Sequence, residues 1–170
     1  MMYKWIGAAL IIAGCGCVGF AIAAAYLREE RELRKLITAL DYMACELQYR
    51  LTPLPDLCRQ AGRECTGIVG RILTELALEL ECGLKPEVGD CVIEALCKVG
   101  EIPRRVRDAF LLLGSSLGRF DVEGQMKGLE MARTSCRREL EMMENGRDNR
   151  LRSYQTLGIC AGAALAILFV

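Results

Sequence analysis

The sequence predicts an all-α protein, an antiparallel helical bundle flanked by N- and C-terminal transmembrane helices. One observation is a run without charged residues at each end of the chain, Trp5 to Leu27 and Ser153 to Val170. The other is the spacing of apolar residues between these runs, which is helical and never strand-like. We therefore expect a transmembrane helix at 1–27, a cytoplasmic helical bundle at 28–152 and a second transmembrane helix at 153–170.

The two uncharged runs are long enough to cross a bilayer. At about 1.5 Å per residue they would form helices of about 35 Å and about 27 Å, against a hydrocarbon core of about 30 Å. Arginine and lysine residues follow the first run directly and precede the second, whereas the outer flanks carry only Lys4 and the termini. The positive-inside rule then places the bundle in the cytoplasm and both ends outside.

A cleaved secretory signal is the alternative for the first run, because Lys4 precedes it and Ala23–Ala25 resembles a cleavage site. Its apolar stretch is about twice the usual length of the apolar part of a signal. The positive charges from Arg28 onward also oppose translocation. We therefore expect a retained helix and keep a secreted helical protein, cleaved after Ala25, as the alternative.

Proline and glycine residues that break helices divide the middle of the chain into several helices. Two prolines within Thr52–Pro55 cannot lie inside a helix, so the first helix ends near Arg50 and a turn follows. Thr66-Gly67 bends the chain again, and Gly83 is a suitable C-terminal cap. The expected helices are 28–50, 54–65, 68–80, 85–99, 103–117 and 121–150. The residues expected to face inward in the fourth and fifth helices are Val88, Val92, Ile93, Leu96, Val99, Val106, Phe110, Leu113 and Leu117.

The composition excludes several classes of function. Lysine plus arginine and aspartate plus glutamate number 22 each, so no net charge favours nucleic acid. The chain has no histidine, which removes the commonest general base and the commonest metal ligand. We therefore expect no enzymatic activity and neither a cofactor nor a metal ion.

Ten cysteines occur, but none forms the C-x-x-C pair typical of zinc sites. Cys15, Cys17 and Cys160 lie in the uncharged runs, and the others follow helical patterns. We interpret them as small buried apolar residues in a reducing compartment. The alternative is a membrane-anchored thiol-dependent enzyme, for which Cys58 or Cys65 near the proline turn would be the nucleophile.

The stretch from Leu113 to Asp121 has two glycines and could be taken for a phosphate-binding loop. It lacks the P-loop lysine and follows a helix, so we interpret Gly114 as a close helix crossing. Gly118 would end the helix before Asp121, which caps the last one. Arg133 is the one charge in the apolar seam of that last helix, and we expect it to pair with an acid or to contact a partner.

Several short motifs follow one another along the chain. Glu46-Leu47-Gln48-Tyr49 leads into Thr52-Pro53-Leu54-Pro55. Leu113-Gly114 and Leu117-Gly118 precede Asp121 and Gln125, and Asn149, Tyr154 and Leu157-Gly158 follow. In this order and over the whole length, the chain resembles the stage III sporulation protein AB family of endospore-forming bacteria.

The resemblance implies a non-enzymatic inner-membrane platform component of a secretion-like channel between mother cell and forespore, required for endospore formation. The family is similar to the platform protein of type II secretion and type IV pilus systems. The implied partners are a cytosolic secretion-type ATPase, membrane and ring-forming components of the channel, and lipid of the mother-cell membrane facing the forespore. We predict partner contacts at Glu46, Thr52, Pro53, Leu54, Pro55, Gly114, Gly118, Arg119, Asp121, Gln125 and Arg133.

Overall fold

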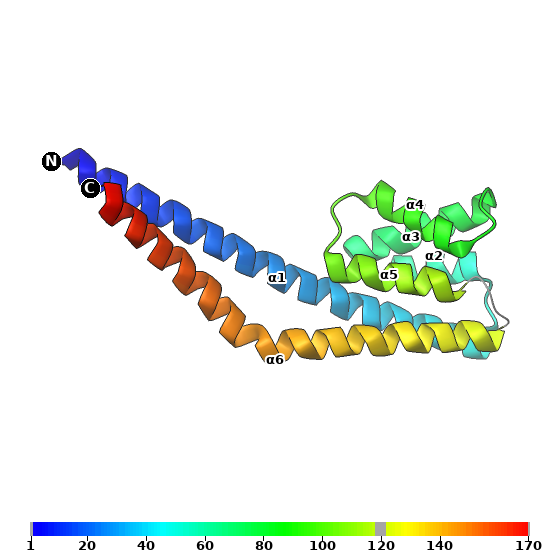
Figure 1. Ribbon diagram of the computed structural model, residues 1–170. Coiled ribbons are helices and arrows are strands. Elements are labelled where there is room, and N and C mark those ends of the chain that lie inside the picture. Colours follow the sequence, from blue (N-terminus) through cyan, green and yellow to red (C-terminus); the bar gives the residue numbers. More distant parts are fainter. Residues whose placement is uncertain (1, 118–121, 170) are drawn as a thin grey trace. The chain divides into compact units, whose positions relative to one another are not determined.

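The computed structural model describes residues 2–117 and 122–169, which form helices joined by short connections (Figure 1). No strand occurs in these two ranges, so the predicted all-α class is confirmed. The predicted cap Asp121 and the predicted contacts Gly118 and Arg119 lie outside the described residues. The helices are α1 (Met2–Arg50), α2 (Leu54–Glu64), α3 (Ile68–Cys82), α4 (Val88–Val99), α5 (Arg104–Leu117) and α6 (Val122–Phe169).

The chain forms two compact units. One consists of Met1–Arg28 together with Met142–Val170. The other, Glu29–Glu141, contains α2 to α5 and is called the bundle below. Both α1 and α6 contribute residues to both units.

Among the residues that the structure describes, no helix has an apolar stretch long enough to cross a membrane. The finding does not support the two predicted transmembrane helices. Several side chains of the uncharged runs, including those of Trp5 and Tyr154, lie outside the described part.

The first unit contains a hydrogen bond between α1 and α6. The Tyr26 hydroxyl donates to the backbone carbonyl oxygen of Met143 at 2.8 Å, and both residues are buried. Large apolar side chains elsewhere on this part of α1 are exposed, namely Val18, Phe20 and Ile22 at 61%, 59% and 46%.

Helix boundaries in the bundle follow from the residues expected to break helices. Pro55 occupies the first turn of α2, where its missing N–H removes no helical hydrogen bond. Gly83 follows α3 with φ of +60°, a left-handed conformation in which glycine has no steric penalty. The predicted cap is confirmed. Gly67, immediately before α3, has φ of +92°, which glycine also adopts without a steric penalty.

The bundle core is built by consecutive helices: α2 packs on α3, α3 on α4 and α4 on α5. The four residues predicted to face inward on α5 are all buried. On α4 the prediction for Ile93 is wrong, because this side chain is 50% exposed. The buried arc of α4 contains Val92, Leu96 and Val99, and Ile93 lies beyond its edge.

Candidate functional site

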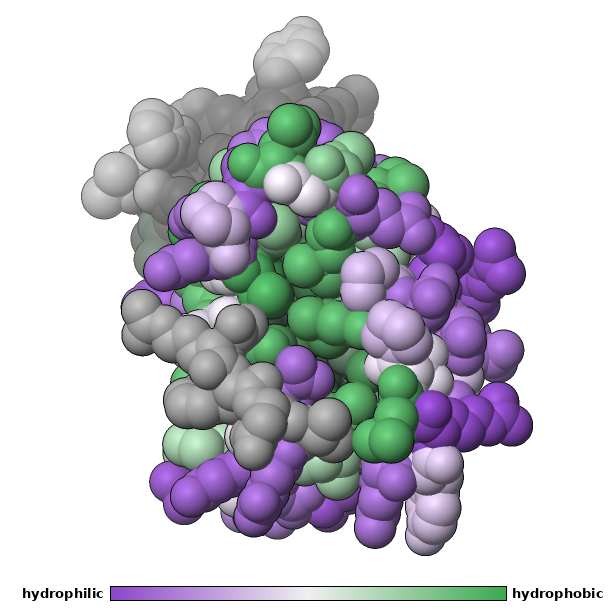
Figure 2. All heavy atoms as spheres, turned by 90° about the vertical axis from the view of Figure 1, so that its right-hand side faces the viewer, coloured by the Kyte–Doolittle hydropathy of each residue, from purple (hydrophilic) through white to green (hydrophobic). Residues whose placement is uncertain are grey.

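One end of the bundle brings the predicted contact surfaces together. Figure 1 shows the end of α1, the start of α2, the end of α5 and the start of α6 at this end. Figure 2 looks onto it and shows hydrophobic residues in the middle, with hydrophilic residues around them. The turn at Thr52–Pro55 and the described part of the Gly114–Gln125 corner, far apart in sequence, therefore share one end of the fold.

The turn exposes apolar side chains that the sequence reasoning did not select. Tyr49 and Leu51 are 77% and 64% exposed. Leu51 also has φ of +52°, a conformation that a branched apolar side chain rarely adopts. Glu46 pairs with Arg50 at 3.5 Å, as their helical spacing indicates. Of the predicted contacts, Pro53 is exposed, whereas Thr52, Leu54 and Pro55 are half-buried.

Gly114 allows the close helix crossing that the sequence predicts. A Cβ atom at this position would lie 2.9 Å from Val92 Cγ2 and 3.3 Å from the Cα of Gly89 on α4. Gly114 is buried, and in the structure it serves the close packing of α5 on α4. Gln125, near the start of α6, is half-exposed.

Arg133 pairs with acids, as predicted for a charge in the apolar seam. Its guanidinium donates to Asp41 of α1 at 2.9 Å and to Glu130 at 2.7 Å. Arg137 reaches the same Asp41 carboxylate at 3.3 Å. These pairs hold α6 against α1, although exposed ion pairs contribute only about 0–1 kcal/mol each.

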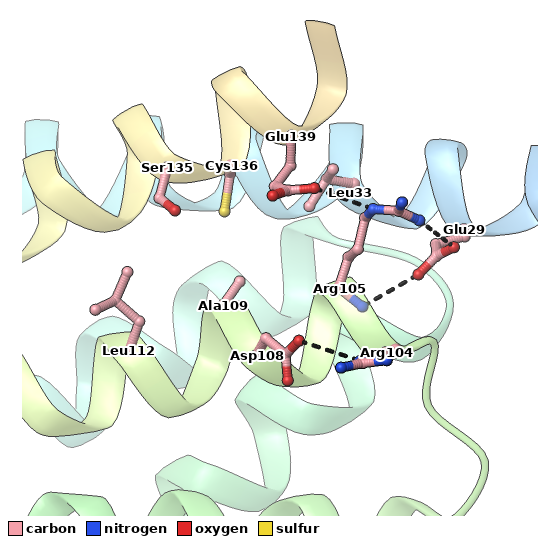
Figure 3. Close-up of a pocket in the computed structure, with 10 residues that line it drawn as sticks. All are labelled: Glu29, Leu33, Arg104, Arg105, Asp108, Ala109, Leu112, Ser135, Cys136 and Glu139. Carbon is pink, nitrogen blue, oxygen red and sulfur yellow. Dashed lines mark hydrogen bonds and ion pairs between the residues drawn. The ribbon is translucent and has the colours of Figure 1, made fainter. Parts of the chain in front are cut away.

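A second charged cluster joins three helices around a cavity of about 510 Å³ (Figure 3). Arg105 of α5 donates from Nη1 to Glu29 of α1 at 2.9 Å and from Nε to Glu139 of α6 at 3.1 Å. Its backbone N–H also donates to Glu29 at 3.1 Å. Burial by itself lowers the pKa of Arg105, but the hydrogen bonds and charges of these two carboxylates raise it above its usual value.

The charged groups of this cavity pair with one another, and its thiol stays protonated. Glu29 and Glu139 both accept hydrogen bonds from one guanidinium, which is always charged. Burial raises the pKa of the lining Cys136 thiol to about 11, so a thiolate does not form near neutral pH. The cluster was missed by sequence reasoning because Arg105 lies 76 and 34 residues from its partners.

Glu32 is a buried carboxylate that caps α3, and sequence reasoning did not detect it. It is only 6% exposed and accepts hydrogen bonds from the backbone N–H groups of Ile68 and Val69, at 3.1 and 3.4 Å. Lys35 Nζ donates to the same carboxylate at 2.8 Å. A negative charge at a helix N-terminus is favourable, and here it comes from a neighbouring helix.

Only some of the cysteines are buried, so the expectation that they are small buried apolar residues needs correction. Cys58, Cys91 and Cys136 are buried, but five others are exposed: Cys17, Cys45, Cys82, Cys97 and Cys160. Their helices place these five on outward faces. Within the described ranges, no three cysteine or acidic residues lie close enough together to hold a metal ion.

Comparison with known proteins identifies the family. The family model for stage III sporulation protein AB matches residues 4–170, nearly the whole chain. The chain belongs to this family. A relative named stage III sporulation protein AB, from Bacillus subtilis (strain 168), is 24% identical over 172 residues, which cover 99% of this chain and 100% of that protein.

A solved structure of a stage III sporulation protein AB shares the fold. It superposes with a TM-score of 0.63 at 21% identity, and the match covers 72% of this chain and 98% of that one. The resemblance drawn from the proline turn and the Leu-Gly motifs is thereby confirmed at the level of the family.

The thiol pKa values argue against the thiol-enzyme alternative. Complete burial raises the pKa of Cys58 to about 12, and burial also raises the pKa of Cys65 despite the nearby Lys35. A nucleophilic cysteine needs the opposite shift. In the native protein at pH 7, we expect Cys45, Cys82 and Cys97 to react with iodoacetamide.

The same labelling should leave Cys58 and Cys136 unmodified until the chain is denatured. Mass spectrometry of peptides from native and denatured samples measures this difference. Fast labelling of Cys58 or Cys65 in the native protein would restore the thiol enzyme as a candidate.

Proposed function

We propose that the chain is a non-enzymatic, membrane-anchored platform of a secretion-like channel between mother cell and forespore. In this proposal a cytosolic secretion-type ATPase docks on the end of the bundle that carries the proline turn. Membership of a sporulation protein family supports a role in endospore formation. The observation that carries the docking site is the exposed apolar surface of Tyr49 and Leu51 at that end.

The chemistry of the surface supports binding to a protein. Aromatic side chains supply much of the energy of protein interfaces, and Tyr49 is largely exposed here. Leu51 stays exposed in an unfavourable left-handed conformation, which costs about 1–3 kcal/mol. Such strain is more common at functional positions than elsewhere. The half-buried Thr52 and Pro55 would then position these contacts without making them.

Anchoring in the membrane rests on the uncharged runs at the two ends of the sequence. The exposed Val18, Phe20 and Ile22 in the first run support membrane anchoring. Exposing three large apolar side chains of one helix to water is unfavourable. The mother-cell membrane facing the forespore and the ring-forming partners follow from the family resemblance. The two helices that contribute to both units would connect the docked ATPase to the membrane.

Substitution of Tyr49 or Leu51 by aspartate tests the docking site. We expect Tyr49→Asp and Leu51→Asp each to weaken binding of the organism's purified secretion-type ATPase by roughly tenfold or more, since each removes an apolar contact and adds a charge. Neither should unfold the bundle, because both side chains are exposed and aspartate tolerates positive φ better than leucine does.

Leu78→Asp is the matched control, because Leu78 is an exposed leucine of α3 at 47%. Binding is measured by surface plasmon resonance with the full chain, and folding by circular dichroism. Unchanged affinity in both turn variants, with the fold intact, would remove the ATPase from this end of the bundle.

A further inference from the structure

Glu29 and Glu32 of α1 bind the starts of two other helices in the same way. One carboxylate oxygen of Glu32 accepts hydrogen bonds from the first two backbone N–H groups of α3, and the other accepts from Lys35 Nζ. One oxygen of Glu29 accepts from the Arg105 backbone N–H in the first turn of α5, and the other from the Arg105 guanidinium (Figure 3). Each carboxylate thus binds a helix start and a cation, and together the two are called the double cap.

The two helices that α1 caps are those without an acidic cap of their own. Helices α2, α4 and α6 each carry an acid in the first turn, namely Asp56, Asp90 and Glu123. Helices α3 and α5 carry none, and the residues before them, Gly67 and Pro103, have no side-chain acceptor. Helix α5 also begins with two arginines, whose positive charge is unfavourable at a helix N-terminus. The double cap therefore supplies the acceptors that α3 and α5 lack.

The spacing on α1 makes the two caps depend on each other. Glu32 follows Glu29 by three residues, so on one rigid helix they lie about 4.5 Å apart along the axis and about 60° apart around it. Turning α1 by one residue position, about 100°, would withdraw both carboxylates from the N–H groups at once. The shortest cap bonds are already 3.1 Å between nitrogen and oxygen, so a small displacement breaks them.

We propose that the double cap is a lock that fixes the rotation and height of α1 in the bundle. A turn or pull applied to α1 then opens the first turns of α3 and α5 together. Because α1 is one continuous helix with residues in both units, a displacement that begins in its N-terminal part reaches the double cap about 30 Å before Tyr49. The lock requires neither the proposed ATPase nor a membrane.

The contact between Asp41 of α1 and α6 does not fix α1 in this way. Asp41 pairs with Arg133 and Arg137 at 2.9 and 3.3 Å, but its side chain is 40% exposed. Long arginine side chains can follow a movement of α1, and exposed pairs of this kind are weak. The double cap instead holds backbone N–H groups, which cannot follow, and the side chains of Glu32 and Glu29 are only 8% and 16% exposed.

Hydrogen exchange of single backbone amides, measured on the purified full chain in mild detergent, tests the lock. Glu32→Ala should speed exchange of the Ile68 and Val69 amides roughly tenfold, because they lose their acceptor. It should also speed exchange of the Arg105 amide by about threefold or more, although Glu29 is still present, because α1 is then held at one point only.

Glu29→Ala should give the converse pattern, with the larger effect at Arg105 and the smaller at the two α3 amides. Asp41→Ala is the matched control, because it removes an acid of α1 that pairs with another helix but caps none. It should leave all three amides unchanged. If each glutamate variant affects only the amides that it uncaps, Glu29 and Glu32 are separate caps and the lock is wrong.

Pro103→Asp separates the lock from a general loss of stability. It gives α5 an N-cap of its own, at a position where aspartate is preferred. Combined with Glu29→Ala, it should restore slow exchange at Arg105 and leave the two α3 amides fast, because α1 is still free to turn. Restoration at both helices would overturn the proposal. Exchange of the Leu96 amide in α4 that rises as much as exchange in α3 would overturn it too, since the whole bundle would then be destabilised.

Discussion

Gly70→Ala should lower the free energy of unfolding of the bundle by about 3 kcal/mol or more, the upper range for an overpacked site. A Cβ atom at Gly70 would lie far inside contact distance of the Cys65 carbonyl oxygen, and 2.9 Å from that of Gly62. Both atoms belong to backbone, which cannot rotate away as a side chain can. The substitution must therefore separate α2 from α3, and thermal unfolding followed by circular dichroism measures the loss.

Gly89→Ala is the matched control, because it adds the same methyl group to a helical glycine with room around it. The nearest atom to its Cβ would be the Gly114 carbonyl oxygen, at 3.9 Å. Replacing a helical glycine by alanine stabilises a helix by about 0.5–1 kcal/mol when nothing clashes. Equal stability of the two variants would show that α2 and α3 do not cross as closely as the structure indicates.

Glu32→Ala should lower the free energy of unfolding by about 2–4 kcal/mol. The change leaves two buried backbone N–H groups at the start of α3 without an acceptor and removes the partner of Lys35. Each unsatisfied buried donor costs about 1–3 kcal/mol. Denaturant unfolding of the full chain, with its midpoint and slope compared with the native protein, gives the difference.

Two further variants separate the cap from the ion pair. Glu32→Gln keeps one acceptor oxygen but removes the charge. It should therefore lower the free energy of unfolding less than the alanine variant does. Lys35→Met should cost the least, because the Lys35 side chain is 36% exposed and such pairs contribute only about 0–1 kcal/mol. If the order were reversed, the ion pair and not the helix cap would be the source of stability.

The positions of the helices were predictable because their ends depend on local residues. Prolines near Thr52 and glycines at 67, 83 and 100 end helices through their own backbone preferences, without help from distant residues. Inward faces were predictable on α5, where the four apolar residues at helical spacing are all buried. Ile93 was placed wrongly because α4 packs between α3 and α5. The sequence does not show where the part of the α4 surface that these two helices bury ends.

The charged clusters could not be predicted in the same way. Glu29 and Glu32 lie in a run of acids and bases that a single sequence cannot distinguish from a solvated helix face. Their partners on α3 and α5 are brought near by tertiary packing alone. The exposure of Tyr49 and Leu51 was also missed, since apolar residues at the end of a helical pattern are normally expected to be buried.

The packing of each central helix on its successor also bears on how the chain folds. Such contacts close short loops, and chains rich in them have low contact order and fold rapidly. Helices α2 to α5 can therefore associate early, while the protein is still being synthesised. By contrast, Asp41 and Arg133 are 92 residues apart, so α1 must wait for α6 before their shared contacts form. Until α6 has left the ribosome, the part of α1 that packs on α6 stays uncovered and is exposed to aggregation.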